Sequence, residues 1–145
     1  MDDLLTLLND NETLACTLAI TVTEATPQRV VATMPVTPRI HQPFGYLHGG
    51  ASVALAETVA SIGGQLNCGP GQQAFGQEIN ANHTRPVASG WVTATVTPAS
   101  LGRRSHVWEI RIVNDAGKLV CISRCTLAVI DGRSTYSTVD ERAGQ

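Results

Sequence analysis

One apolar segment in the middle of the chain constrains the fold more than any other feature. Residues 49–64 read Gly-Gly-Ala-Ser-Val-Ala-Leu-Ala-Glu-Thr-Val-Ala-Ser-Ile-Gly-Gly, and the pattern predicts a helix over about 51–66. A helix that is apolar or small on every face is normally buried. This one carries a single carboxylate, Glu57, and burying an unpaired carboxylate costs several kcal/mol or raises its pKa. Because no Lys or Arg lies between Arg39 and Arg85, either the fold brings a partner from afar or Glu57 has a chemical role.

Strand patterns lie on both sides of this helix. Segments rich in Thr and Val predict two strands before it, and alternating segments predict four after it; the six ranges are 15–24, 29–34, 72–83, 90–101, 105–114 and 119–130. A short helix is expected at 2–9 and a loose polar tail at 131–145. The 145 residues suit one domain, 1–145, with 1–14 as an N-terminal helix or arm. A single antiparallel sheet that buries one apolar helix curves around it, so we predict an α+β fold of this kind.

Composition excludes several classes of function. The net charge is −2 with no run of basic residues, so neither nucleic acid nor a membrane is an expected partner. Only 15% of the residues are charged, which leaves room for an oligomeric interface. Most of the Lys and Arg follow residue 84 and nearly all are Arg. Arginine suits bidentate contacts with phosphate, although solvated strand faces are an alternative explanation.

The cysteines and histidines show no metal-ligand spacing, so no metal is expected. Nothing at the start of the sequence resembles a secretory signal, and we therefore expect a reduced, cytoplasmic protein. Cys121 and Cys125 lie four residues apart in a predicted strand, so we interpret them as small core residues rather than as a redox pair.

The start of the predicted helix combines groups that suit acyl transfer. Free N–H groups and the helix macrodipole favour negative charge there, and Gly49 has no Cβ to keep a ligand away. An N–H aimed at a carbonyl oxygen stabilises the oxyanion of acyl transfer. Glu57 can be the nucleophile or general base, and Ser61 lies four residues further on the same face. Gly49 and Glu57 are about 12 Å apart along one helix, so we expect two copies of the chain to supply them.

Ordinary structural roles are alternatives for each of these residues. Glu57 could be a buried carboxylate bonded to the backbone or to a distant Arg, and His48 could be a histidine that caps the helix or packs in the loop. Ser61 could be a small helix-packing residue, and Gln42 an amide that caps a loop. A histidine and two glycines leading into a buried helix with a lone carboxylate are more specific together than any one of them alone.

These residues resemble a known family. The segment His41-Gln-Pro-Phe-Gly-Tyr-Leu-His-Gly-Gly-Ala-Ser-Val-Ala-Leu-Ala-Glu57 is similar to the signature of hot-dog acyl-CoA thioesterases. The similar branch contains 1,4-dihydroxy-2-naphthoyl-CoA thioesterase of menaquinone synthesis and the enterobactin proofreading thioesterase. Further similarity lies at Glu78-Ile-Asn-Ala-Asn-His83 and Leu101-Gly-Arg-Arg104, and roughly residues 30–130 are covered. The resemblance implies a hot-dog fold, a curved antiparallel sheet of about six strands wrapped around one long central helix.

The resemblance also implies roles for individual residues. Glu57 corresponds to the catalytic carboxylate, and the Gly49 N–H to the group that polarises the thioester carbonyl. Gln42 and His48 correspond to positions that orient or polarise the thioester, and Ser61 to a hydroxyl that assists the water. The residues expected to bind substrate, of which the arginines correspond to positions that meet coenzyme A, are Thr58, Ile62, His83, Arg85, Gly102, Arg103, Arg104 and Ser105.

The leading hypothesis is an enzyme, an acyl-CoA thioesterase. Its expected substrate is an aromatic (benzoyl- or dihydroxynaphthoyl-like) or medium-chain acyl-CoA, or the equivalent acyl-carrier-protein thioester. No cofactor is expected, because coenzyme A is part of the substrate. The expected assembly is a homodimer with sites at its interface, paired further into a homotetramer. The alternatives are a hot-dog enoyl-CoA hydratase, which calls for an Asp/His pair where only His48 is present, and a non-catalytic acyl-CoA-binding module.

Overall fold

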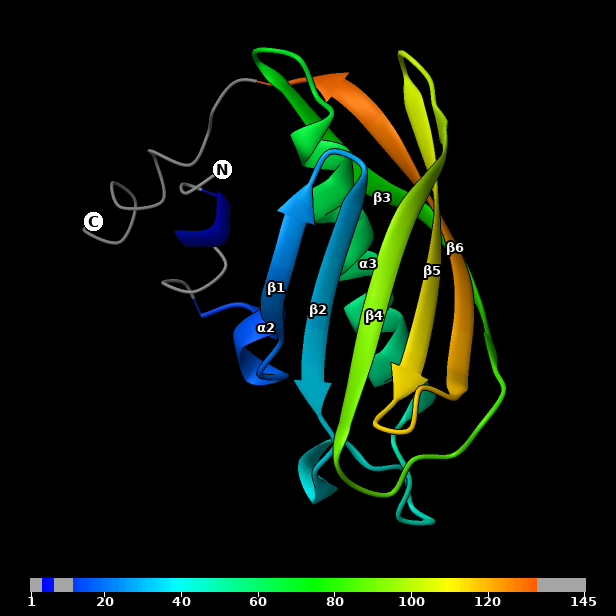
Figure 1. The fold of residues 1–145 in the computed structure, drawn as a ribbon. Coiled ribbons are helices and arrows are strands. Elements are labelled where there is room, and N and C mark those ends of the chain that lie inside the picture. Colours follow the sequence, from blue (N-terminus) through cyan, green and yellow to red (C-terminus); the bar gives the residue numbers. More distant parts are fainter. Residues whose placement is uncertain (1–3, 7–11, 133–145) are drawn as a thin grey trace, which may run out of the picture.

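Residues 4–6 and 12–132 are described by the computed structural model. Two strands, one long helix and four strands follow one another, as expected (Figure 1). The elements are α2 (Leu14–Thr17), β1 (Thr21–Thr26), β2 (Arg29–Pro35), η1 (Pro38–Ile40), α3 (Gly49–Leu66), β3 (Gln72–His83), β4 (Trp91–Leu101), β5 (Ser105–Asn114) and β6 (Leu119–Asp131). The predicted strands after the helix agree with the observed ones to within one residue at each end.

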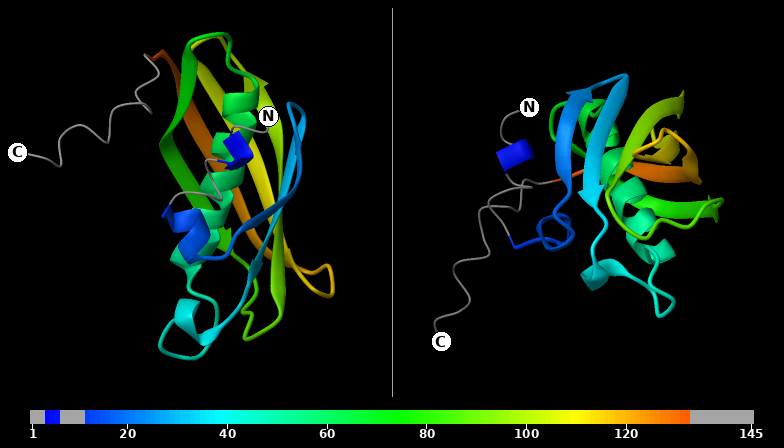
Figure 2. Two further views of the ribbon diagram at one scale, coloured as in Figure 1. Left: turned by 90° about the vertical axis from the view of Figure 1, so that its left-hand side faces the viewer. Right: turned by 60° about the horizontal axis from the view of Figure 1, so that its bottom comes forward.

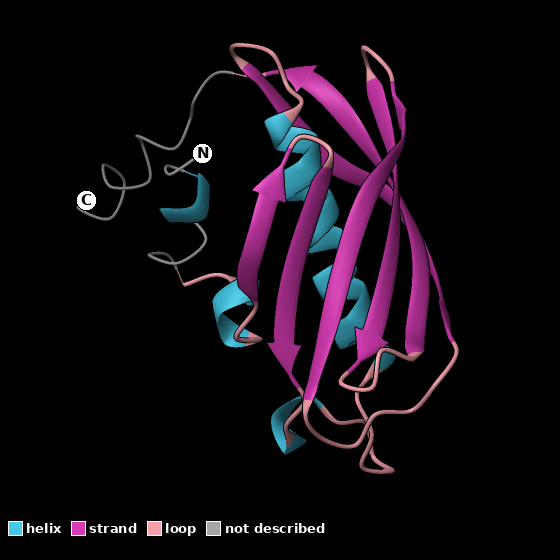
Figure 3. Ribbon diagram, viewed as in Figure 1, coloured by secondary structure: helices cyan, strands magenta, loops and turns pink. Residues whose placement is uncertain are grey.

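The six strands form one antiparallel sheet in the order β1-β2-β4-β5-β6-β3, so β1 and β3 are its edges. The sheet curves around α3, which lies along its concave face (Figures 2 and 3). The predicted fold, a curved antiparallel sheet around one long helix, is therefore confirmed.

Alternation along the central strands produces the core. Val92, Ala94 and Val96 of β4 and Ile110 and Ile112 of β5 are fully buried, because every second side chain of a strand points to the same face of the sheet. These side chains face α3, and the intervening residues of both strands are half-buried or exposed.

One side of α3 is less buried than its composition predicts. Leu55, Ala56, Val59 and Ala60 are fully buried against the sheet. The side that carries Glu57 is only half-buried, and it is formed by Val53, Ala54, Glu57, Thr58, Ser61 and Gln65. The expectation that this helix is buried on every face is therefore wrong for the single chain, because the sheet wraps around only part of it.

The predicted strand at 15–24 is wrong in its first half. Thr13 caps one helical turn, α2, by accepting a hydrogen bond from the N–H of Cys16 at 3.4 Å. The chain then reverses at Ala19, which has a positive φ of 53°, before β1 begins at Thr21. Residues 4–6 of the expected helix at 2–9 are helical. The rest of that helix and residues 133–145 of the expected tail lie outside the described residues.

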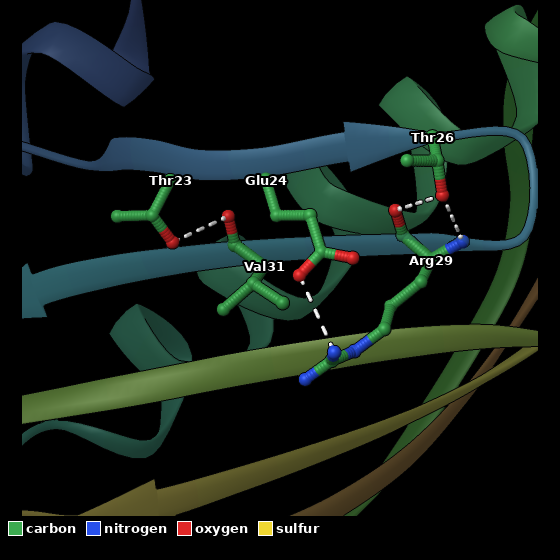
Figure 4. Close-up of polar contacts among 5 residues, drawn as sticks. All are labelled: Thr23, Glu24, Thr26, Arg29 and Val31. Atoms are coloured by element: carbon green, nitrogen blue, oxygen red, sulfur yellow. Dashed lines mark hydrogen bonds and ion pairs between the residues drawn. The ribbon is translucent and has the colours of Figure 1, made fainter.

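The β1–β2 hairpin forms one edge of the sheet, and polar side chains stabilise it (Figure 4). The Thr26 hydroxyl accepts the N–H of Arg29 and donates to its carbonyl, both at 3.0 Å. Arg29 also pairs with Glu24 at 3.3 Å, and Thr23 donates to the carbonyl of Val31 at 3.3 Å, beside the bulge in this strand pair. These contacts place the turn near the C-terminal end of α3, where Asn67 donates to the carbonyl of Pro27 at 2.8 Å.

Candidate active site

His48 caps the N-terminal end of α3 with its own side chain. Its Nδ1 atom accepts a hydrogen bond from the N–H of Gly50 at 2.8 Å, and its carbonyl accepts the N–H of Ala51 at 3.0 Å. This is the alternative role given above for His48. Because Nδ1 is an acceptor, the neutral ring carries its proton on Nε2, and that N–H is still able to donate to a ligand.

Gly49 occupies the first position of α3, where a helix leaves the backbone N–H without an intrahelical acceptor. No other group in residues 4–6 or 12–132 accepts this N–H. A Cβ at Gly49 would lie 2.8 Å from Nε2 of His83, so the histidine ring packs directly on the glycine. The backbone N–H of Gly49 therefore has no acceptor among the described residues and lies at the positive end of the helix dipole, where a ligand can accept it.

A hollow of about 370 Å³ lies beside this amide, and we call it the helix-tip hollow. The loop before α3, the start of α3 and the segment after β3 contribute to its lining, which consists of Gln42, Tyr46, Leu47, Gly49, Ser52, His83, Thr84, Arg85, Pro86 and Val120. Four of the residues predicted to act in the site therefore come together: Gln42, Gly49, His83 and Arg85.

Backbone hydrogen bonds fix the loop that carries Gln42. Leu47 donates to the carbonyl of Val87 at 2.7 Å, and His48 donates to the carbonyl of Ile40 at 2.8 Å. The side-chain oxygen of Gln42 accepts the N–H of Phe44, which is the loop-capping role given as its alternative. The NH₂ group of Gln42 makes no hydrogen bond to any described residue, so it is available to a ligand in the helix-tip hollow.

A second hollow, of about 660 Å³, lies along the half-buried side of α3, and we call it the Glu57 hollow. It is bounded by α3, by the segment around α2 and by the first half of β3, and its lining consists of Leu4, Thr13, Leu14, Ala15, Gly50, Val53, Ala54, Glu57, Thr58, Ser61, Ile62, Gln65, Ala74, Phe75 and Gly76. The four helix residues predicted to act in the site, Glu57, Thr58, Ser61 and Ile62, therefore share one hollow.

The carboxylate of Glu57 has no ion pair or hydrogen bond with any residue in the described part of the chain. The ion pairs found there join Arg29 to Glu24 and Arg124 to Glu109. Thr58 donates its hydroxyl to the carbonyl of Ala54 at 2.7 Å, so its oxygen can still accept. The described residues therefore do not support the structural alternative, in which an arginine or the backbone holds the Glu57 carboxylate.

The two hollows divide the predicted catalytic residues. Gly49 and Glu57 both belong to α3, which has 18 residues, and their separation of eight positions corresponds to about 12 Å along the axis. Each lines a different hollow. One thioester group cannot contact both residues within a single chain.

The predicted coenzyme A contacts also lie apart. Gly102, Arg103, Arg104 and Ser105 form the turn between β4 and β5, which Gly102 closes by donating to the carbonyl of Ser105 at 2.9 Å. This turn is at the end of the molecule opposite to the start of α3 (Figure 1). It is therefore far from Arg85, which lines the helix-tip hollow.

Burial keeps the strand cysteines protonated. Cys121 and Cys125 are fully buried, as predicted for core residues. Burial, and then the negative charges of Glu57 and Glu78, raise the pKa of Cys125 to about 12, so this thiol is not a nucleophile at neutral pH. In residues 4–6 and 12–132, no three His, Cys, Asp or Glu side chains are placed to hold a metal ion together. No helix in that part of the chain is long and apolar enough to span a membrane.

Two residues beside Glu57 were missed in the sequence. A Cβ at Gly76 would collide with Oε1 of Glu57, and Gln65 joins α3 to β3 by donating to the carbonyl of Gln72 at 3.1 Å and accepting the N–H of Ala74 at 3.2 Å. A glycine inside a strand pattern is a signal of close approach, but the sequence alone does not show which residue approaches it.

Several known proteins are similar to this chain. Residues 44–121 match the model of the thioesterase superfamily. A 1,4-dihydroxy-2-naphthoyl-CoA hydrolase of Listeria monocytogenes is 48% identical over 113 residues, which cover 78% of this chain and 92% of that protein. The proofreading thioesterase EntH of Cronobacter sakazakii is 47% identical over 113 residues, covering 78% and 82%.

Solved structures agree with these matches. A thioesterase of Haemophilus influenzae superposes with a TM-score of 0.85 at 45% identity, covering 93% of both chains. The match extends over α3 and the sheet, so the hot-dog fold is shared. Over half of the chain matches the family model, and the chain belongs to the thioesterase superfamily.

Proposed function

We propose that this enzyme hydrolyses acyl-CoA thioesters, with Glu57 as nucleophile or general base and the Gly49 N–H as the group that polarises the carbonyl. The observation that carries the proposal is the carboxylate of Glu57, which lines an open hollow without a partner among the described residues. Thr58 and Ser61 place hydroxyl groups in the same hollow. Catalysis accounts for a carboxylate in this position, whereas a structural ion pair does not.

The name of one relative supports an aromatic acyl group, and the lining of the Glu57 hollow suits an apolar one. One relative carries the name 1,4-dihydroxy-2-naphthoyl-CoA hydrolase and another the name proofreading thioesterase. The Glu57 hollow has Leu14, Phe75 and Ile62 in its lining, which suits an apolar acyl group. The proposed substrates are therefore benzoyl-like, dihydroxynaphthoyl-like or medium-chain thioesters of coenzyme A or of an acyl carrier protein.

A second copy of the chain completes the proposed site. The half-buried side of α3 faces the Glu57 hollow, and two apolar side chains of that hollow are strongly exposed, Leu14 at 61% and Phe75 at 48%. Two copies related by a two-fold axis present the same surface to each other. With their α3 helices antiparallel, each Glu57 faces the helix-tip hollow of the other copy.

The antiparallel arrangement also accounts for the separated arginines. In such a dimer the helix start of one copy lies at the same end as the β4–β5 turn of the other. Arg85 of one chain is then at the same end of the dimer as Arg103 and Arg104 of its partner, and guanidinium groups suit the phosphates of coenzyme A.

On the outer face of the sheet, Ile122 is 39% exposed, and the hollow around it includes Glu109 and Arg111. A surface that combines an exposed apolar side chain with side chains of opposite charge supports pairing of two dimers into a homotetramer. A cytoplasmic location is also part of the proposal, and the buried Cys121 and Cys125, which form no disulfide, are compatible with a reducing compartment.

Two routes use the same residues. In the first, Glu57 takes a proton from water, the water oxygen bonds to the carbonyl carbon, and the C–S bond breaks to release the thiol with that proton. In the second, a carboxylate oxygen of Glu57 attacks the carbonyl carbon and expels the thiolate, and water then hydrolyses the mixed anhydride. In a single turnover in heavy-oxygen water, label in Glu57 identifies the second route, because it enters only when water attacks the Glu57 carbonyl carbon of the anhydride.

Hydrolysis of benzoyl-CoA, followed by a chromogenic thiol reagent, tests the function. We expect release of free thiol by the natural protein and a loss of at least about a thousandfold in kcat for Glu57→Ala. Glu24→Gln, which removes an exposed carboxylate of the β1–β2 hairpin, is the matched control and should retain full activity, because an exposed ion pair contributes little to stability. Binding of benzoyl-CoA without thiol release would instead identify an acyl-CoA-binding module, and addition of water to an enoyl-CoA a hydratase.

A further inference from the structure

The geometry points to Gly76 as a positioning residue for Glu57, because its missing side chain leaves the space in β3 that the carboxylate occupies. This inference rests on the proposed function of Glu57. The three atoms nearest to a Cβ built at Gly76 all belong to that side chain. They are Oε1, with which the Cβ would collide, Cδ at 3.1 Å and Cγ at 3.6 Å.

Space, and not backbone conformation, is what requires glycine here. Among the described residues the glycines with positive φ are Gly45, Gly71, Gly90 and Gly117. Gly76 has an ordinary strand conformation, which alanine adopts without strain. A methyl group at this position is therefore compatible with the backbone and incompatible with the observed place of the carboxylate.

Strand β3 is held in place beside this space, so it cannot easily retreat. On one side Gly76 pairs with Leu127 of β6, next to a bulge that lies between Gly76 and Glu78. On the other side the Gln65 amide is bonded to Gln72 and Ala74, at 3.1 and 3.2 Å. A collision at Gly76 therefore moves the end of the flexible Glu57 side chain and leaves the strand where it is.

The predicted consequence of Gly76→Ala is a folded enzyme with a displaced carboxylate. A displacement of about 1 Å in a catalytic group can reduce turnover about 100-fold, and we expect a fall of that order in kcat for benzoyl-CoA. The loss should appear in kcat more than in KM, because the atoms nearest to the added methyl group all belong to the Glu57 side chain. Gly69→Ala is the matched control. Gly69 has no positive φ, its Cβ would face only the Gln72 side chain at 3.3 Å, and its kcat should not change.

A double variant separates positioning from a general structural effect. Glu57→Asp shortens the side chain by one methylene. Its carboxyl carbon then lies near the position of the Glu57 Cγ, 3.6 Å from the Cβ in Gly76→Ala, which relieves the collision with Oε1. The double variant should therefore lose less activity than the product of the two single losses. If Gly76→Ala lowers the unfolding midpoint, adding Glu57→Ala should restore it, because the collision involves that side chain alone.

Three results would overturn the inference while leaving the function of Glu57 intact: natural kcat in Gly76→Ala beside an inactive Glu57→Ala, independent losses in the double variant, or an unfolding midpoint that Glu57→Ala does not restore. Full activity of Glu57→Ala would instead overturn the proposed function itself.

Discussion

Mixing two inactive variants should restore activity, because the distance between Gly49 and Glu57 divides each site between two chains. Glu57→Ala removes the carboxylate. Gly49→Ala puts a methyl group on the α carbon next to the amide, only 2.8 Å from Nε2 of His83, so the ring and the amide cannot keep their positions. In a two-fold dimer of one variant with the other, one site carries both defects and the second site carries neither. Random exchange makes half of the dimers mixed, so activity should return to about one quarter of the natural value.

The assay is benzoyl-CoA hydrolysis before and after the two purified variants are mixed, unfolded in urea and refolded together. Each variant refolded by itself should remain inactive, which controls for recovery during refolding. Thermal unfolding of Gly49→Ala shows whether the variant keeps its fold. If the folded variants exchange subunits and the mixture stays inactive, Gly49 and Glu57 do not act across two chains, and the argument from their separation of about 12 Å is refuted.

Three further predictions concern stability and substrate contacts. Burial lowers the pKa of His106, so the unfolded chain binds a proton more readily than the folded one, and the free energy of unfolding should fall as the pH drops below about 6.5. In His106→Leu the urea midpoint should depend less on pH, and an unchanged pH dependence would contradict this role of His106. Trp108 is fully buried, and a Cβ at Gly63 would lie 2.9 Å from its ring; Trp108→Ala should cost roughly 3–5 kcal/mol in urea unfolding, and a cost below about 1 kcal/mol would refute the packing argument. Arg103→Ala with Arg104→Ala should raise KM for benzoyl-CoA about tenfold but leave KM for a benzoyl thioester of pantetheine unchanged; equal effects on both substrates would exclude a contact with the nucleotide.

Much of the fold could be predicted because its signals are local. Alternation along β4 and β5 places Val92, Val96 and Ile110 on one face, and this period of two is visible in the sequence. The turn α2 was not predictable in the same way. Leu14 and Ala15 favour a helix, but a turn of four residues is too short to show a helical period. The cap at Thr13 and the positive φ of Ala19 are features of the folded chain.

The candidate site was only partly predictable, because its parts meet through the tertiary structure. The residues at the start of α3 and the carboxylate of Glu57 are recognisable from their order along the chain. Gly76 follows from the register of an edge strand against a helix, and Gln65 from a side chain that bridges two elements. The half-buried side of α3 could not be foreseen, since the sequence does not show how far the sheet wraps around the helix.

A crystal structure with a benzoylmethyl thioether of coenzyme A, in which a ketone replaces the thioester, tests the central claim most directly. We predict that the ketone oxygen lies about 3 Å from the Gly49 nitrogen of one chain. We also predict that the carbonyl carbon lies about 3–3.5 Å from the Glu57 carboxylate of another chain, or from a water molecule that this carboxylate binds. A ketone held away from Glu57, or a Glu57 carboxylate paired with an arginine in the assembled enzyme, would contradict the account.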